Sequence, residues 1–91
     1  MPANSVLLEM DGTHAAASLQ VALEKLDRGD GEVVLDFSSI DRIDPSELKL
    51  MEKLAGLAGD KSAKIVLHGV NERIYKALKL ANLTGRFSFE K

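Results

Sequence analysis

Two short apolar runs constrain the fold of this chain more than any other feature. Residues 33–37 read Val-Val-Leu-Asp-Phe, and residues 64–68 read Lys-Ile-Val-Leu-His. Short β-branched runs of this kind are typical of strands in the middle of a sheet. The stretch between them is long enough to hold a helix, so the pattern predicts strands joined by a helical crossover.

The remaining segments extend this alternation. Residues 5–10 predict a first strand, and apolar residues at helical spacing predict a helix over 14–28, with Thr13 as its cap. A third helix is predicted from Asn71, as its cap, to about Ala81. Residues 86–89 alternate as a final strand. The element order β-α-β-α-β-α-β predicts an α/β sheet with crossover helices.

The second helix has the clearest start in the sequence. In the run Asp44-Pro45-Ser46-Glu47, Asp44 suits the N-cap and Pro45 suits the first helical position. Glu47 stands where a capping box needs an acid. We expect the helix to run to about Ala58 and to close at Gly59.

Two apolar stripes run along this predicted helix. The first, at inward-facing spacing, consists of Leu48, Met51, Ala55 and Ala58. The second, rotated from the first, consists of Leu50, Leu54 and Leu57. A helix packed on one face of a sheet buries one broad stripe. The second stripe is therefore either an exposed partner-binding surface or the margin of a wide buried face.

Composition excludes several classes of protein. The chain has 91 residues, of which 45% are hydrophobic and 29% charged, as in an ordinary globular domain. It contains no cysteine, which excludes disulfides, thiolate metal sites and a cysteine nucleophile. Residues 1–5 carry no basic side chain, and no apolar run approaches a membrane span of about 20 residues. We therefore expect a cytoplasmic protein without membrane insertion.

The sequence offers little catalytic or cofactor chemistry. His14 and His68 lie on different predicted elements without neighbours at metal-ligand spacing, and no phosphate-binding glycine loop is present. We expect no metal, no cofactor and no enzymatic activity. Four carboxylates lie close together in the sequence: Asp36, Asp41, Asp44 and Glu47. One exposed acidic edge explains this cluster at least as well as paired acid–base catalysis does.

Charge is unevenly distributed along the chain. The net charge is −2, but residues 1–60 carry twelve acidic and five basic side chains, a balance of −7, and residues 61–91 carry a balance of +5. The segregated charge is either a property of a solvated surface or one end of the molecule that binds an oppositely charged partner. Nucleic acid is not favoured, because the chain is acidic overall and has one tyrosine and no tryptophan for base stacking.

Ser46 is the one candidate for modification. Its position in the first turn of a helix places it beside unpaired backbone N–H groups, where a phosphate is tolerated. Phosphorylation would add about 1.5–2 negative charges between Asp44 and Glu47. Ser46 also suits a first turn without any modification.

Several segments, taken in order, resemble a STAS domain. These are residues 33–40, the helix start at 44–48, the strand at 64–70 and the closing helix and turn at 78–87. The resemblance covers nearly the whole chain. It implies a single domain over 1–91, with a roughly four-stranded mixed sheet and about three helices packed mainly on one face. It also implies a role in protein–protein interaction.

Two branches of the family give different partners. In anti-sigma factor antagonists, the serine matching Ser46 is phosphorylated by an anti-sigma factor that is also a serine kinase, and Asp44 matches the motif aspartate. Pro45 and Glu47 depart from that motif. Other members are accessory subunits of lipid-handling ABC transporters, whose partner is the transporter ATPase. The candidate partner-binding residues are Asp44, Glu47, Leu50, Leu54 and Leu57.

Two further alternatives belong to other classes of protein. One is a carrier protein with a prosthetic group on Ser46, although carriers are helical bundles and the chain has predicted strands. The other is a small enzyme that uses the acidic edge, although it would lack a phosphate-binding motif.

Overall fold

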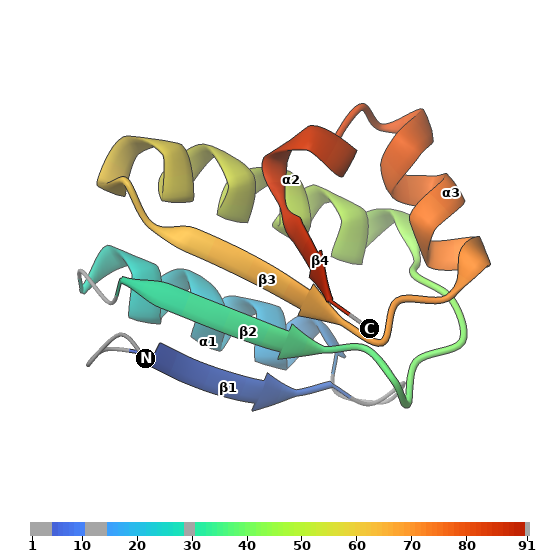
Figure 1. Cartoon of the computed structure of the whole chain (residues 1–91), viewed down its shortest axis with the longest axis horizontal. Coiled ribbons are helices and arrows are strands. Elements are labelled where there is room, and N and C mark those ends of the chain that lie inside the picture. Colours follow the sequence, from blue (N-terminus) through green and yellow to red (C-terminus); the bar gives the residue numbers. More distant parts are fainter. Residues whose placement is uncertain (1–4, 11–14, 29–30, 91) are drawn as a thin grey trace.

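Strands and helices alternate along the chain as the sequence predicts (Figure 1). The computed structural model describes residues 5–10, 15–28 and 31–90. Its elements are β1 (Ser5–Glu9), α1 (Ala15–Asp27), β2 (Glu32–Asp36), α2 (Pro45–Lys61), β3 (Lys64–His68), α3 (Glu72–Leu80), the short 3₁₀ helix η1 (Thr84–Arg86) and β4 (Ser88–Glu90).

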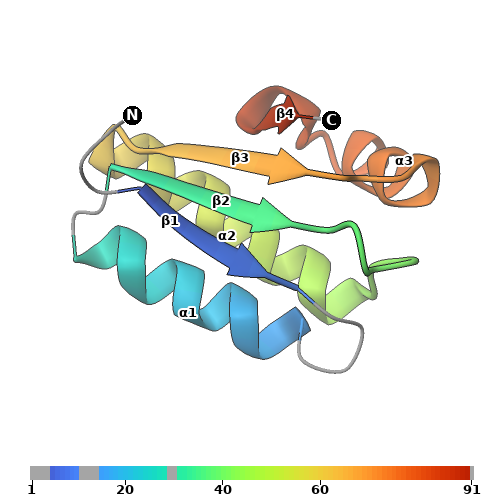
Figure 2. The same cartoon turned by 60° about the horizontal axis from the view of Figure 1, so that its bottom comes forward.

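The four strands form one sheet in the order β1-β2-β3-β4. Every neighbouring pair is parallel, so the sheet is parallel throughout rather than mixed, which corrects the predicted strand directions. The reason is that each connection contains a helix, which returns the chain to the edge where the previous strand began. α1 and α2 lie side by side on one face of the sheet, as expected (Figure 2).

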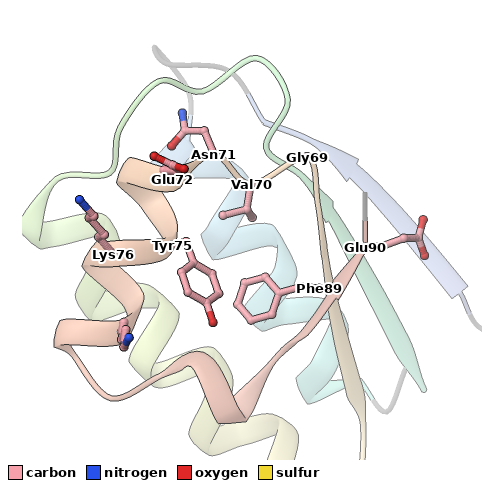
Figure 3. Close-up of a pocket in the computed structure, with 9 residues that line it drawn as sticks. Gly69, Val70, Asn71, Glu72, Tyr75, Lys76, Phe89 and Glu90 are labelled. Carbon is pink, nitrogen blue, oxygen red and sulfur yellow. The ribbon is translucent and has the colours of Figure 1, made fainter.

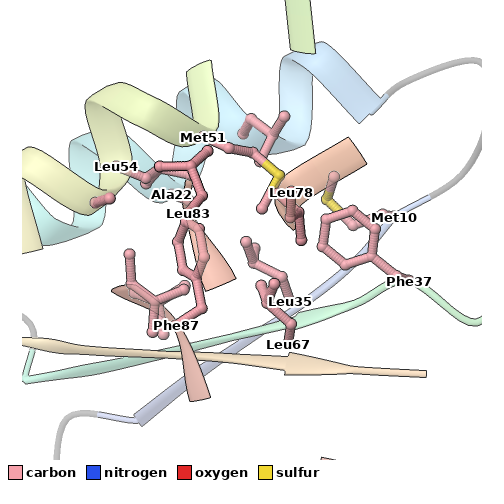
Figure 4. Packing of buried hydrophobic residues seen from close by; sticks show 14 of the residues in the cluster. Met10, Ala22, Leu35, Phe37, Met51, Leu54, Leu67, Leu78, Leu83 and Phe87 are labelled. Carbon is pink, nitrogen blue, oxygen red and sulfur yellow. The ribbon is translucent and has the colours of Figure 1, made fainter. Parts of the chain in front are cut away.

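The hydrophobic core lies between these helices and the sheet (Figure 4). The inward faces of β2 and β3 contribute Val33, Leu35, Ile65 and Leu67. The two long helices contribute Ala15, Leu19, Ala22, Leu26, Met51, Leu54, Ala55 and Ala58. Burial of this apolar surface is the main stabilising contribution to the fold.

Helix α2 buries part of each of its two apolar stripes. Leu54 is fully buried, and Leu50 and Leu57 are half-buried and pack against the core. The interpretation of the second stripe as an exposed partner-binding surface is therefore wrong for Leu54. The cause is that α2 packs against α1 as well as the sheet, so a wide arc of its surface is removed from water.

Helix α2 also ends later than expected. It continues through Gly59 to Lys61, and Ser62 then adopts the left-handed conformation with φ 54°. The predicted cap Thr13 and the residue His14 lie outside the described residues. Within the described ranges, no helix is long and apolar enough to cross a membrane.

Candidate functional site

The candidate site lies on the loop between β2 and α2, which begins with two anchors. The amide of Phe37 donates to the carbonyl of His68 at 2.7 Å, and the amide of Ile40 donates to the carbonyl of Phe37 at 3.0 Å. The Ile40 side chain is buried. These contacts hold the start of the loop against the end of β3.

A close contact between Ser38 and Gly69 also holds this loop. Gly69 has φ +72°, and a Cβ built on it would lie 2.9 Å from the Cβ of Ser38. Any other residue would therefore be strained and would also collide with the loop. Ser38 is itself held, because its amide and hydroxyl donate to Asp36 Oδ1 at 3.0 and 2.6 Å.

Asn71 fastens the loop to the third helix. Its side-chain oxygen accepts from the amide of Ile74 at 2.9 Å, which caps α3 as predicted. Its side-chain nitrogen donates to the carbonyls of Asp41 at 2.8 Å and Ile40 at 3.2 Å. One amide group therefore both starts α3 and positions the segment that leads into α2.

The start of α2 is a complete capping box, as predicted. Asp44 Oδ1 accepts from the amide of Glu47 and from the Ser46 hydroxyl, each at 2.8 Å. Glu47 Oε1 accepts from the amide of Asp44 at 2.9 Å. The Glu47 amide and then the Ser46 hydroxyl stabilise the charged carboxylate and hold the pKa of Asp44 below its ordinary value.

The candidate residues divide into exposed and buried groups. Asp44 and Ser46 are exposed, as is Asp41 in the preceding loop. Glu47 is only 8% exposed, because its carboxylate folds back onto the cap. The Glu47 carboxylate is therefore used by the cap, and a contact between Glu47 and a partner stays a prediction. A hollow of about 530 Å³ lies beside the cap and is lined by residues 40–45 and Glu47.

The acidic cluster is used for local structure. Asp36 binds the Ser38 hydroxyl and amide, and these two hydrogen bonds, the hydroxyl first, lower the pKa of Asp36. Asp44 and Glu47 cap α2. In the part of the chain that the structure describes, no three side chains are grouped as metal ligands. The geometry thus presents an exposed polar edge at the start of α2, held by these hydrogen bonds.

The chain is thus a small parallel α/β domain with a hydrogen-bonded, polar helix start beside the sheet. The family model described as "Mlab, STAS domain" matches residues 6–89. The chain therefore belongs to the STAS domain family, and the resemblance noted from its sequence is confirmed.

Two curated relatives share 36% identity with this chain over 53 residues. They are the proteins named "Intermembrane phospholipid transport system binding protein MlaB" from Escherichia coli (strain K12) and from Shigella flexneri. The match covers 58% of this chain and 55% of each relative, so the chain spans about half the length of these relatives.

Two solved structures of one Thermotoga maritima protein share the fold. A crystal structure, titled as a proposed anti-sigma factor antagonist, has a TM-score of 0.73 at 19% identity and covers 97% of this chain and 74% of its own. An NMR structure of the protein, TM1081, has a TM-score of 0.79 at 18% identity. The match covers 100% of this chain and 77% of that chain. At these identities the likeness shows the fold alone.

Proposed function

We propose that this chain is a non-enzymatic docking subunit of a phospholipid transport system, and that it binds the ATPase of that system. The docking surface is the α2 edge, which we define as Asp41, Asp44 and Ser46. The proposal is supported by the family match and by the 36% identity to proteins named for that kind of system. The anti-sigma factor antagonist branch is supported by fold likeness alone.

The observation that carries the proposal is the set of contacts that holds this edge in place. Gly69 contacts the loop, Asn71 binds two of its carbonyls, and the capping box fixes its end. A surface that is already ordered loses little conformational entropy on binding. The Ser46 hydroxyl donates its proton to Asp44, so the exposed Ser46 oxygen and Asp44 carboxylate offer acceptors to a partner.

Binding of Ser46 variants to the purified ATPase tests this proposal. Ser46→Arg places a long cation on the edge and should weaken binding about tenfold, the scale of one well-placed interface contact. Ser46→Ala and Ser46→Asp should bind about as well as the wild type, because the hydroxyl is not required in this branch. Calorimetry at two salt concentrations measures the affinities.

Matched variants separate docking from folding. Ala16 is exposed in the first turn of α1, so Ala16→Arg makes the same kind of change on another helix start. It should leave ATPase binding unchanged. Ser46→Ala should shift the free energy of unfolding by less than about 0.5 kcal/mol, because Asp44 still caps α2. Equal affinity of Ser46→Arg and wild type would contradict the assignment of the α2 edge.

A second candidate function is an antagonist switched by phosphorylation of Ser46. It is favoured by the exposure of the hydroxyl in the first turn of α2. A phosphate there would replace the Ser46–Asp44 hydrogen bond with like-charge repulsion. In that case Ser46→Asp should weaken binding to a cognate anti-sigma factor kinase about 5- to 150-fold, while Ser46→Ala stays bound.

The other sequence-based alternatives fare differently. A carrier protein would be a helical bundle, and the four-stranded sheet removes that alternative. The cytoplasmic location, the lack of nucleic-acid binding and the single-domain extent of residues 1–91 stay predictions. Leu50 and Leu57, half-buried on α2, stay candidates for contacts at the margin of the docking surface.

A further inference from the structure

A second and larger cavity lies between α3 and β4, and no residue of the α2 edge lines it. Its volume is about 840 Å³. Its apolar wall is formed by Val70, Tyr75 and Phe89. The rings of Tyr75 and Phe89 point toward one another and meet edge to face, with their centroids 5.3 Å apart (Figure 3).

The α3–β4 corner exposes apolar surface. Tyr75 is 44% exposed and Phe89 is 38% exposed. These are two of the five large hydrophobic residues that are exposed among the described residues, and their rings are in contact. Apolar side chains gathered at one place on a surface are typical of a binding site.

Two lysines and two glutamates line the cavity. Lys76, Lys79 and Glu72 line it from α3, and Glu90 lines it from β4. The Glu90 carboxylate points away from the rings (Figure 3) and lies 3.5 Å from His68 Nδ1. Residues 61–91 carry a charge balance of +5. The basic character of this part of the chain favours an acidic ligand.

The backbone of β4 adds a preference for an extended ligand. The carbonyl of Glu90 accepts from the amide of Gly69 and so faces β3. Because backbone groups alternate along a strand, the N–H and C=O of Phe89 face the opposite edge. β4 is the last strand in the described sheet. An unpaired strand edge can pair with an added peptide strand.

We propose that this α3–β4 groove binds an extended acidic segment of a partner protein. One aromatic or branched aliphatic side chain of that segment packs against Tyr75 and Phe89, and its carboxylates meet Lys76 and Lys79. The inference goes beyond the docking of the α2 edge, because it assigns a second surface with a different chemistry.

Selection from a random peptide display library tests the groove directly. The immobilised full chain should enrich peptides that carry one aromatic or branched aliphatic residue flanked by Asp or Glu. Affinity of the enriched peptides should fall about tenfold in Tyr75→Ala, a loss typical of a central anchor contact. It should fall at least as much in the double variant Lys76→Glu, Lys79→Glu, and should decrease as salt is raised.

Three controls keep the outcome specific. Lys53 is exposed on α2, so Lys53→Glu reverses a charge outside the groove and should change peptide affinity less than about twofold. Lys76→Arg keeps the charge and should retain binding. Ser46→Arg should leave peptide binding intact, which separates this test from that of the α2 edge. Urea unfolding of the lysine variants shows whether the fold is kept.

Two outcomes would overturn the proposal. One is that the selection does not enrich acidic peptides with an apolar anchor. The other is binding of such peptides to the double lysine variant within about twofold of the wild type, which is less than the effect of a lost charge pair at an interface. If no peptides are enriched, sedimentation with phosphatidylglycerol vesicles is the next measurement. Sedimentation of the wild type that is lost in the double lysine variant would assign the groove to an anionic lipid surface instead.

Discussion

The α1–α2 layer and the α3–β4 corner pack against the same sheet but differ in how much apolar surface they leave exposed to solvent. The two long helices α1 and α2 leave little of it exposed. α2 buries Leu54 completely and Leu50 in part. α3 buries Ile74 and Leu78 but leaves Tyr75 largely in solvent.

Helix length and position account for this difference. α2 has 17 residues and α3 has 9, so they extend about 25 Å and about 14 Å respectively. α2 also has a helical neighbour in α1, whereas the Tyr75 ring of α3 meets Phe89 on the last strand of the described sheet. The exposed rings of Tyr75 and Phe89 therefore lie where a short helix meets an edge strand, whereas the second apolar stripe of α2 is buried or half-buried.

The largest effect that sharpens this comparison is expected for Leu54→Asp. A carboxylate placed in the core between α2, α1 and the sheet would lack a partner, so we expect a loss of about 4 kcal/mol or complete unfolding. Leu50→Asp and Leu57→Asp should cost less, because both side chains are half-buried. Urea unfolding followed by circular dichroism measures each change.

Leu80→Asp is the matched control for this prediction. Leu80 is 90% exposed on α3, so the same substitution should change the free energy of unfolding by less than about 0.5 kcal/mol. A similar loss of stability in Leu54→Asp and Leu80→Asp would contradict the contrast between the two regions.

Local signals in the sequence predicted much of the fold and of the α2 edge. The residues Asp44, Pro45 and Glu47 each have a distinct role in a helix start, so the capping box was predictable to the residue. The strand at 64–68 was predictable from its short β-branched run. Such features depend on near neighbours along the chain.

Features that depend on tertiary packing were not predictable in this way. The burial of Leu54 depends on α1, which the periodicity of α2 does not reveal. The Glu47 side chain folds back onto the cap, so it is not the exposed charge that a glutamate in a first helical turn suggests. Asn71 was predicted as a cap, but its two bonds to the loop join residues about thirty positions apart. The α3–β4 groove likewise needs the edge position of β4.

An intermediate effect is expected for Asn71→Ala, at the place where the two regions meet. The variant removes the N-cap of α3 and leaves the carbonyls of Ile40 and Asp41 without their donor. Loss of a cap and of these hydrogen bonds should cost about 2 kcal/mol. Urea unfolding measures the loss, and hydrogen exchange of the Ile74 amide should rise.

Asn71→Asp provides the companion variant. An aspartate still accepts from the Ile74 amide but cannot donate to the loop carbonyls. We expect it to protect α3 while it loosens the α2 edge, so ATPase binding should weaken while hydrogen exchange of the Ile74 amide stays near the wild-type rate. Asn71 also lines the α3–β4 groove, so the new carboxylate should weaken binding of acidic peptides as well. A rise in Ile74 exchange as large as that of Asn71→Ala would show that the aspartate does not keep the cap.

The smallest effect concerns the acid dependence of stability. The folded pKa values of Asp36 and Asp44 lie below their ordinary value of 3.8, so in acid the unfolded chain binds more protons than the folded one. The resulting stabilisation is fully present above a pH of about 5 and is lost as the pH falls through 3.8 toward the folded values. Asp44 is exposed and Asp36 is only half-buried, so the change is small.

Asp44→Asn isolates the contribution of the α2 start to this acid dependence. Asparagine still caps a helix but does not titrate, so urea midpoints of the variant should fall less steeply between pH 5 and pH 3 than those of the wild type. An unchanged slope in Asp44→Asn would assign the acid dependence to Asp36 and its bonds with Ser38, and would show that the capping box is not a source of acid sensitivity at the docking edge.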